Sequence, residues 1–293
     1  MRTASLIPPA ALVGVLLLTA CGTEGADDAT GSRPTSVCAT AEAGDAAGME
    51  LDGVRINALG GAGYSGCAEF QVTNDEPEAF TYTVTFDFLS ETGGGVMRNR
   101  AETVASVPPG GTVKRILKAS QPLVTAQGQP LVRISKVRSV PADEAPAPGG
   151  PCPESGIRLT ADQGDAAMGL RVVGLHLENC GTRPYHLDGY PRVDVVDEAH
   201  EVVTDVKVVE GGGSTALGTG ADAPARPLDL APGERARSTL VWRNTTEFGT
   251  PVNAPYARVV AKPGAAPVMV TPELDLGTTG KLGVGAWQRE ETR

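Results

Sequence analysis

The sequence predicts an all-β protein made of two β-sandwich modules in tandem, and three observations lead to this prediction. The 293 residues include 37 Gly and 23 Pro, which divide the chain into short segments. Many of these segments alternate apolar and polar residues, the pattern of strands whose sheet buries one face. Two cysteine pairs of nearly equal spacing, one in each half, indicate that the halves are built alike. The length is sufficient for two domains that each bury a core.

The first twenty residues have the composition of a secretory signal peptide. Their apolar run, Leu6 to Ala20, is shorter than the roughly 20 apolar residues that a membrane-spanning helix needs. It ends in Leu18-Thr19-Ala20-Cys21, which resembles the bacterial lipobox, in which the cysteine receives a diacylglycerol on its sulfur. We therefore expect residues 1–20 to be removed and Cys21 to carry acyl chains such as palmitate. The alternative is an ordinary signal peptide followed by an unmodified cysteine.

Residues 21–37 are expected to form a disordered tether behind the lipidated cysteine. They show no apolar periodicity and consist mainly of Gly, Ala, Thr, Asp and Ser. Such a segment cannot bury enough surface to offset the entropy lost on ordering. A flexible chain of about 16 residues would hold the first module on the order of 20 Å from a bilayer.

The remaining cysteines, Cys38, Cys67, Cys152 and Cys180, are expected to form two disulfide bonds. An even number of cysteines in an exported protein is typical of disulfides. The spacing of 29 positions in the first pair and 28 in the second favours Cys38–Cys67 and Cys152–Cys180 over the two other connectivities. Metal-binding thiolates are the weaker alternative, because the sequence contains no C-x-x-C pair.

The two modules are predicted at residues 38–140 and 152–288, with a Pro/Ala-rich linker at 141–151 and a tail at 289–293. Period-two alternation is clearest from Phe80 to Leu89 in the first module and from Arg235 to Arg243 in the second. Each module has about seven alternating segments, which is the strand count of an immunoglobulin-like sandwich. The cysteine spacing differs from that of antibody domains, so the expected likeness is one of architecture.

An ordered set of short motifs in the second module carries a resemblance to a known family. The motifs are Cys152-Pro153-Glu154-Ser155-Gly156, Glu178-Asn179-Cys180-Gly181-Thr182-Arg183-Pro184-Tyr185, Gly189-Tyr190-Pro191, Leu230-Ala231-Pro232-Gly233-Glu234 and Asp275-Leu276-Gly277-Thr278-Thr279. Together they resemble the domain of unknown function 4232, which is frequent in secreted and lipid-anchored proteins of actinobacteria. Many members of that family have a cysteine where this chain has Tyr185. The resemblance implies an extracytoplasmic location and supplies no catalytic residue.

Composition and motifs argue against several classes of function. The formal net charge of -10 disfavours nucleic acid, whose phosphates require a basic surface. All three histidines, His176, His186 and His200, lie in the second module, but the sequence has no G-x-S-x-G or S-x-x-K motif that would supply a nucleophile. We therefore expect no catalytic residue and no cofactor. An envelope hydrolase with an unrecognised site is the alternative.

The densest polar cluster of the chain is expected to be a solvated β-turn. It contains Asp194, Asp197, Glu198, His200 and Glu201, whose side chains alternate faces across a short connection between two valine-rich segments. A hard-cation site would need several oxygens that converge from one loop. No metal site is therefore predicted, although a metal- or solute-binding lipoprotein remains a second alternative.

A candidate binding surface lies on the second module. Arg235, Arg237 and Arg243 share the outward face of one predicted strand, and Trp287 is expected at an exposed sheet margin. Arginine and tryptophan are enriched at binding hot spots, but a charged outer face also keeps a sheet soluble. The sequence thus predicts a lipid-anchored, non-catalytic binding or structural protein at the extracytoplasmic face of the cell membrane. Its partner would be an unknown envelope polymer or protein, and not nucleic acid.

Overall fold

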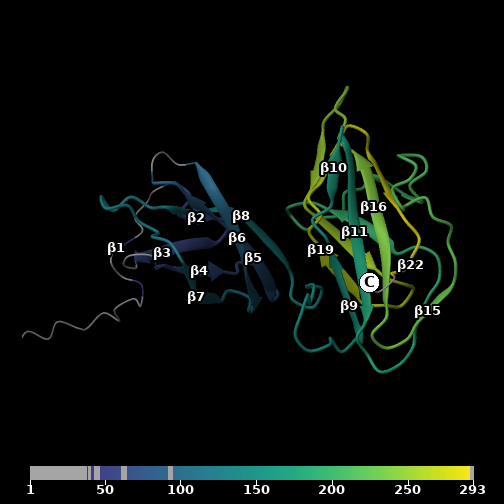
Figure 1. Cartoon of the computed structure of the whole chain (residues 1–293), viewed down its shortest axis with the longest axis horizontal. Coiled ribbons are helices and arrows are strands. Elements are labelled where there is room, and N and C mark those ends of the chain that lie inside the picture. The colour runs from purple at the N-terminus through teal and green to yellow at the C-terminus, as the bar shows by residue number, and fades with distance from the viewer. Residues whose placement is uncertain (1–37, 39–40, 43–46, 61–64, 92–94, 291–293) are drawn as a thin grey trace, which may run out of the picture. The chain divides into compact units, whose positions relative to one another are not determined.

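The computed structural model describes residues 38, 41–42, 47–60, 65–91 and 95–290 (Figure 1). These residues belong to one compact unit of the chain. The predicted signal peptide, Cys21 and the predicted tether lie outside the described residues. Within those residues every regular element is a strand, which confirms the all-β prediction. In the same part of the chain no helix is long and apolar enough to cross a membrane.

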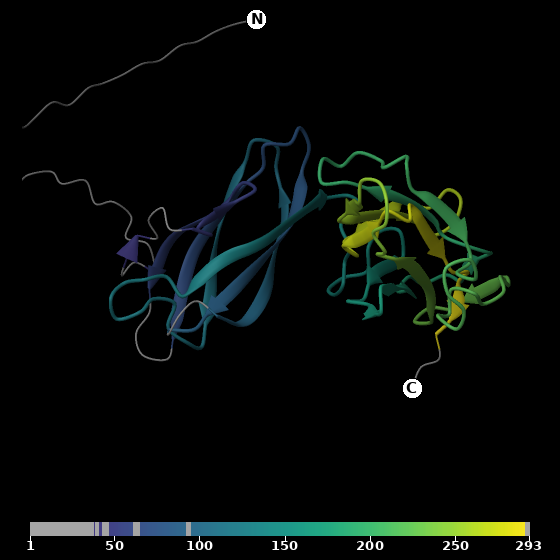
Figure 2. The same ribbon diagram turned by 90° about the horizontal axis from the view of Figure 1, so that it is seen from above.

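The described residues of the first half of the chain form eight strands. Their bounds are β1 (Ala41–Glu42), β2 (Glu50–Leu51), β3 (Val54–Gly60), β4 (Gly66–Thr73), β5 (Phe80–Leu89), β6 (Val96–Val107), β7 (Thr112–Ala119) and β8 (Val132–Pro141). One sheet has the order β1-β3-β4-β7 with β2 also paired to β3, and the other has the order β6-β5-β8. All pairs in these two sheets are antiparallel, and both sheets are drawn in purple to teal in Figure 2.

The two sheets of the first half enclose a hydrophobic core. Strand β5 shows how the sequence produces it, because Phe80, Tyr82, Val84, Phe86 and Phe88 alternate along the strand and are all buried. They pack against apolar residues of β3, β4 and β7 in the facing sheet. The ring centroids of Phe70 and Phe86 lie 5.0 Å apart across the core, edge to face.

The second half forms fourteen shorter strands. Their bounds are β9 (Ile157–Ala161), β10 (Asp165–Ala167), β11 (Leu170–Asn179), β12 (Tyr185–Leu187), β13 (Arg192–Val196), β14 (Lys207–Glu210), β15 (Leu228–Leu230), β16 (Arg235–Arg243), β17 (Val252–Ala254), β18 (Tyr256–Val260), β19 (Pro267–Val270), β20 (Leu274–Gly277), β21 (Lys281–Val284) and β22 (Gln288–Arg289).

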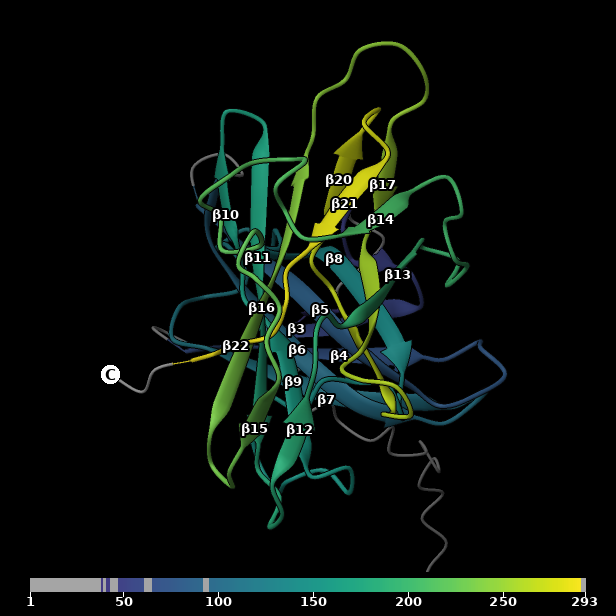
Figure 3. The ribbon, with the colours of Figure 1, turned by 90° about the vertical axis from the view of Figure 1, so that its right-hand side faces the viewer.

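Strands β11 and β16 form the centre of the largest sheet, which has the order β10-β11-β16-β21-β14. Figure 3 shows β16 beside β11, with β22 along its other edge, where Arg237 pairs with Gln288. The pairing of β14 with β21 is parallel, whereas the other pairs of this sheet are antiparallel. Facing this sheet are the smaller sheets β13-β18-β19, β12-β15 and β17-β20, whose inward side chains complete a second hydrophobic core.

Both predicted disulfide bonds are present. Cys38 is bonded to Cys67 and Cys152 to Cys180, with Cα–Cα distances of 5.6 Å in each case. This confirms the pairing inferred from the spacing. Each bond joins residues 28 or 29 positions apart and stays within one half of the chain.

The end of β8 and the residues that follow it pack on the outer face of the sheet β13-β18-β19. Val140 and Ala145 join a small apolar cluster with Val196, Tyr256 and Met269. The backbone oxygen of Glu144 accepts a hydrogen bond of 2.8 Å from the amide of Met269. The first part of the predicted linker therefore covers one end of this sheet and leaves the other end open.

Candidate functional site

The three arginines expected to form a cationic surface lie on β16, but their charges are largely paired. Arg235 lies 3.6 Å from Glu178, and Arg237 lies 3.8 Å from Asp162. Arg243 donates a hydrogen bond of 3.3 Å to the backbone oxygen of Thr215. The expected stripe is also interrupted, because Thr239 and Val241, which lie between Arg237 and Arg243 on the same face, are buried.

The loop 211–221 causes this interruption. It packs closely over β16, so that a Cβ atom added to Gly212 would lie 3.0 Å from Cγ1 of Val241. The amide of Gly212 donates to the backbone oxygen of Ala221, which closes the loop on itself. The outward face of β16 is therefore half covered, and its arginines do not form one continuous patch.

Trp287 is not the exposed anchor that the sequence suggested. Only 1% of the residue is accessible, and it belongs to the second core. Its indole N–H donates a hydrogen bond of 2.9 Å to the backbone oxygen of Ala261. The expectation of an exposed Trp287 was wrong because the connection between β18 and β19 folds over the indole.

Trp287 instead joins two segments that lie far apart in the sequence. Its backbone amide donates to the oxygen of Gly189 at 3.0 Å, while its indole holds Ala261. Gly189 begins the Gly-Tyr-Pro element and has φ +77°, a left-handed conformation that glycine adopts without strain. Tyr190 and Lys262, the residues that follow these two anchored positions, line a common cavity.

This cavity, which we call the basic cavity, has a volume of about 380 Å³. Its cations are Arg192, Arg258 and Lys262, and its lining contains no acidic residue. Arg192 lies opposite Val260, and Val260 lies opposite Pro267, so these three share the outer face of the sheet β13-β18-β19. Asp194, opposite Arg258, is on the same face but does not line the cavity. Residues 140–145 cover this outer face near Val196 and Tyr256. The basic cavity lies at the other end of the same face, near Arg192 and Val260.

The three cations of the basic cavity differ in how much of their charge is satisfied. Arg258 donates a hydrogen bond of 2.7 Å from Nε to Glu144. The Arg192 side chain is 71% exposed, and its nearest carboxylate, that of Asp194, lies 3.8 Å away. Lys262 makes no ion pair with any residue that the structure describes; its Nζ lies 3.8 Å from the ring centroid of Tyr185, a cation–π contact.

A second cavity of about 680 Å³ lies on the other side of Lys262. Tyr185 and Arg158 line it, together with the acidic residues Asp143 and Glu154. Burial raises the pKa of Tyr185, so its hydroxyl remains a neutral hydrogen-bond donor at neutral pH. Nε of Arg158 is buried and has no hydrogen-bond partner, although the Arg158 Nη1 atom lies 3.2 Å from Glu178.

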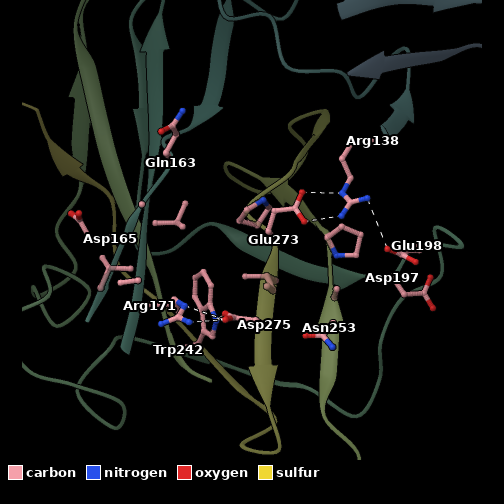
Figure 4. Close-up of a pocket in the computed structure, with 18 of the residues that line it drawn as sticks. Arg138, Gln163, Asp165, Arg171, Asp197, Glu198, Trp242, Asn253, Glu273 and Asp275 are labelled. Atoms are coloured by element: carbon pink, nitrogen blue, oxygen red, sulfur yellow. Dashed lines mark hydrogen bonds and ion pairs between the residues drawn. The ribbon is translucent and has the colours of Figure 1, made fainter. Parts of the chain in front are cut away.

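A third cavity, of about 880 Å³, is lined by several paired charges (Figure 4). Near one end of it, Asp275 accepts hydrogen bonds from Arg171 at 3.1 Å and from the indole of Trp242 at 2.8 Å. Near the other end, Arg138 donates two hydrogen bonds to the carboxylate of Glu273, at 2.9 and 2.8 Å. The charged groups at the two ends of this cavity therefore already have partners.

The surroundings of Glu273 favour the ionised form of its carboxyl group. Burial by itself would raise the pKa of this carboxyl, but the hydrogen bonds and charge of Arg138, with the charge of Lys136, outweigh burial and lower it. A general acid needs the opposite shift, toward a protonated carboxyl at neutral pH. Glu273 is thus suited to holding Arg138 and not to proton transfer.

The three histidines lie apart from one another and have ordinary partners. His176 lies between the carboxylates of Asp162 and Glu290, at 3.2 and 3.3 Å. His186 contacts Asp229 at 2.8 Å. His200 contacts the backbone oxygen of Ser139 at 2.8 Å through Nε2, and its ring stacks on that of Tyr256. Nothing in the sequence pattern around His200 indicated these last two contacts.

The polar cluster around Asp197 is a hydrogen-bonded turn, as expected. The Asp197 carboxylate accepts from the amides of Ala199 and Glu201, both at 2.9 Å. The amide of Asp197 in turn donates to the backbone oxygen of Glu201. Over the residues that the structure describes, no group of three or more His, Cys, Asp or Glu side chains is arranged to hold a metal ion.

Comparison with known proteins identifies the second half of the chain. Residues 152–288 match the family described as domain of unknown function (DUF4232). This half of the chain is therefore similar to the DUF4232 family. The Gly-Tyr-Pro element, Lys262 and Trp287 all lie within the matched residues, so the basic cavity lies in the part of the chain that resembles DUF4232.

The other comparisons add little. No curated protein matches the chain. A solved structure from Bacteroides fragilis, described as a "putative beta-galactosidase", is 13% identical, with 80% of this chain and 34% of that chain covered and a TM-score of 0.25. This chain thus spans about a third of that protein, and a similarity at this TM-score supports no conclusion about fold or function.

Proposed function

We propose that this protein is a lipid-anchored component of the cell envelope that binds an anionic partner without catalysis. In this proposal the chain is held at the extracytoplasmic face of the membrane by lipid on Cys21 and carries two tandem immunoglobulin-like sandwiches. The DUF4232 domain supplies the binding surface. The anchor rests on the lipobox-like sequence alone, whereas the binding surface rests on the geometry of the basic cavity.

One observation carries the binding role: Lys262 makes no ion pair with the described residues, and it lies between the second cavity and the basic cavity, whose own lining has no acidic residue, on a chain of net charge -10. Exposed cations of a folded protein normally lie among compensating carboxylates, as Arg235 and Arg237 do here. A local cationic site on an acidic surface attracts anions through its own field. The paired charges of the cavity of about 880 Å³, in contrast, favour a structural role over catalysis.

The test uses the mature chain, residues 21–293, produced without lipid. We expect it to be retained by an acidic polymer fraction of the envelope, less strongly as the salt concentration rises, and to leave that fraction chemically unchanged. Retention should be compared with that of a neutral polymer fraction. Release of sugars, peptides or fatty acids from either fraction by the purified protein would overturn the non-catalytic proposal.

A further inference from the structure

From the lining of the basic cavity we infer that it binds carboxylate-bearing sugar units of an acidic polysaccharide. This inference rests on the proposed binding function and names its ligand. The cavity combines three cations with an aromatic and apolar lining supplied by Tyr190, Val260 and the two prolines Pro263 and Pro267. Ligand sites commonly pair apolar walls with a few polar groups that fix orientation.

The cations are suited to a carboxylate. Two of the three are arginines, whose planar forks match the two oxygens of a carboxylate better than an ammonium group does. Arg258 already binds one carboxylate of the chain itself, that of Glu144, at 2.7 Å. Arg192, on the neighbouring strand β13, forms only a loose ion pair with Asp194, at 3.8 Å, and its side chain is 71% exposed, so a carboxylate from outside has access to it.

The lining favours a sugar over a phosphate group. Compact phosphate groups are typically held by several convergent backbone amides. The basic cavity instead presents side-chain cations beside the ring of Tyr190 and the flat faces of two prolines, against which the C–H face of a sugar ring can pack. Its volume of about 380 Å³ lies at the lower end of the range for small-ligand sites, as suits short segments of a polymer.

The site is also held in place before a ligand arrives. Trp287 fixes Gly189 through its backbone amide and Ala261 through its indole, and so sets the positions of Tyr190 and Lys262. The ammonium group of Lys262 lies 3.8 Å from the ring centroid of Tyr185, and this cation–π contact helps to hold it in position. A site ordered in advance loses less entropy on binding.

The experiment measures binding of an oligogalacturonate, a chain of uronic acid units, to the mature protein by calorimetry. The comparison ligands are a neutral glucose oligomer of equal length and poly(glycerol phosphate). We expect binding of the uronate oligomer only, or most tightly, and a fall in affinity of about tenfold or more for Arg192→Gln and for Lys262→Gln, since each removes a charge-assisted hydrogen bond. Lys262→Arg should retain most of the affinity.

Lys281→Gln is the matched control. Lys281 is an exposed lysine on β21 of the other sheet and lies outside the basic cavity, so this variant makes the same change in charge and should bind normally. The inference is overturned if the uronate oligomer does not bind, if poly(glycerol phosphate) binds more tightly, or if Lys262→Gln and Lys281→Gln bind equally. If any of these holds while the protein is still retained by an acidic envelope fraction, the inference fails and the proposed function stands. Absence of retention on every envelope fraction removes the proposed function itself.

Discussion

Asn74 and Asn179 make the same hydrogen bonds in the two halves of the chain. Each is buried at the end of a central strand, and its Nδ2 donates to the backbone oxygen four residues later, Glu78 or Arg183. Nδ2 of each also donates a second hydrogen bond of 2.9 Å, to a backbone oxygen just before a proline-containing turn. The acceptor is Val107 for Asn74 and Leu230 for Asn179. Oδ1 of each accepts from the amide two residues later. The two halves therefore share a local design at the same turn.

Replacing either asparagine by alanine should be strongly destabilising. Asn179→Ala removes the side-chain donor to two backbone oxygens and the acceptor of the Gly181 amide, which keeps its bond to Gly156, at a site that is 1% exposed. We expect a loss of about 3 kcal/mol in the free energy of unfolding, and a similar loss for Asn74→Ala. Chemical denaturation measures both. Asn57→Ala, which removes one part-buried hydrogen bond to Gln71, is the control and should cost less than about 1 kcal/mol.

Removal of the second disulfide bond should destabilise the second half of the chain. Cys152→Ala combined with Cys180→Ala opens a loop of 28 residues, which corresponds to roughly 3–4 kcal/mol on the chain-entropy account. Denaturation of the double variant checks the magnitude. Peptide mapping under non-reducing conditions checks the pairing, and a fragment that joins Cys67 to Cys152 would contradict it.

Asp162 should make the stability depend on pH. Burial alone would raise the pKa of this carboxyl, but hydrogen bonds from the amides of Gly174 and Gly164 and from His176 lower it overall. A carboxyl whose pKa is lowered by folding stabilises the protein above its unfolded value of about 3.9, and that contribution is lost as the pH falls through the folded value. Asp162→Asn should therefore cost about 1 kcal/mol at pH 7, a modest figure because the side chain is 36% exposed.

The difference between wild type and Asp162→Asn should shrink as the pH is lowered below about 4. Denaturation curves across the acidic range give this directly. The nearby Asp165→Asn is the control, since Asp165 is exposed on β10 and forms no ion pair with the described residues. A difference that stays constant down to pH 2 would show that the charge of Asp162 is not the cause.

Trp287→Phe should weaken both the fold and the basic cavity. The variant removes the indole N–H and leaves the buried oxygen of Ala261 unpaired, with an expected loss of about 2 kcal/mol. The matched change at the other buried tryptophan, Trp242→Phe, removes the hydrogen bond to Asp275 and should destabilise comparably without affecting the basic cavity. Heteronuclear NMR shifts of the Lys262 and Tyr190 amides should move in the first variant and not in the second.

Cys21→Ala should abolish membrane attachment. Acyl chains contribute about 0.8 kcal/mol for each buried CH₂ group, so two or more of them anchor a protein firmly. The variant, expressed in a bacterium that processes lipoproteins, should leave the detergent phase on partitioning and lack the mass of the lipid. Unchanged partitioning and mass would refute lipidation at this cysteine.

Much of the fold could be predicted because it depends on local patterns. The alternation in Phe80–Leu89 places its aromatic residues in the core, and Ala236, Ser238, Leu240 and Trp242 of β16 are buried as their period-two spacing predicts. Glycine and proline mark the turns between strands, and the cysteine spacing predicts the disulfide pairing.

The candidate site could not be predicted in the same way because long-range packing decides it. Trp287 stands close to a short strand, and nothing in its neighbourhood reveals that residue 261 will cover its indole. Lys262 precedes Pro263-Gly264 and is indistinguishable in sequence from any exposed turn lysine. The Gly189-Tyr190-Pro191 motif was noticed in the sequence only for its family resemblance, and it does not show what lies beside Tyr190.

The contacts of Trp287 also have a consequence for the order in which the site is completed. Arg192, Arg258 and Lys262 all precede Trp287 in the chain, so the cations of the basic cavity are synthesised before the residue that holds Gly189 and Ala261. The two hydrogen bonds that fix the neighbours of Tyr190 and Lys262 can form only after residue 287 has been added. A chain cut short before Trp287 would therefore carry these cations in a cavity that lacks both bonds.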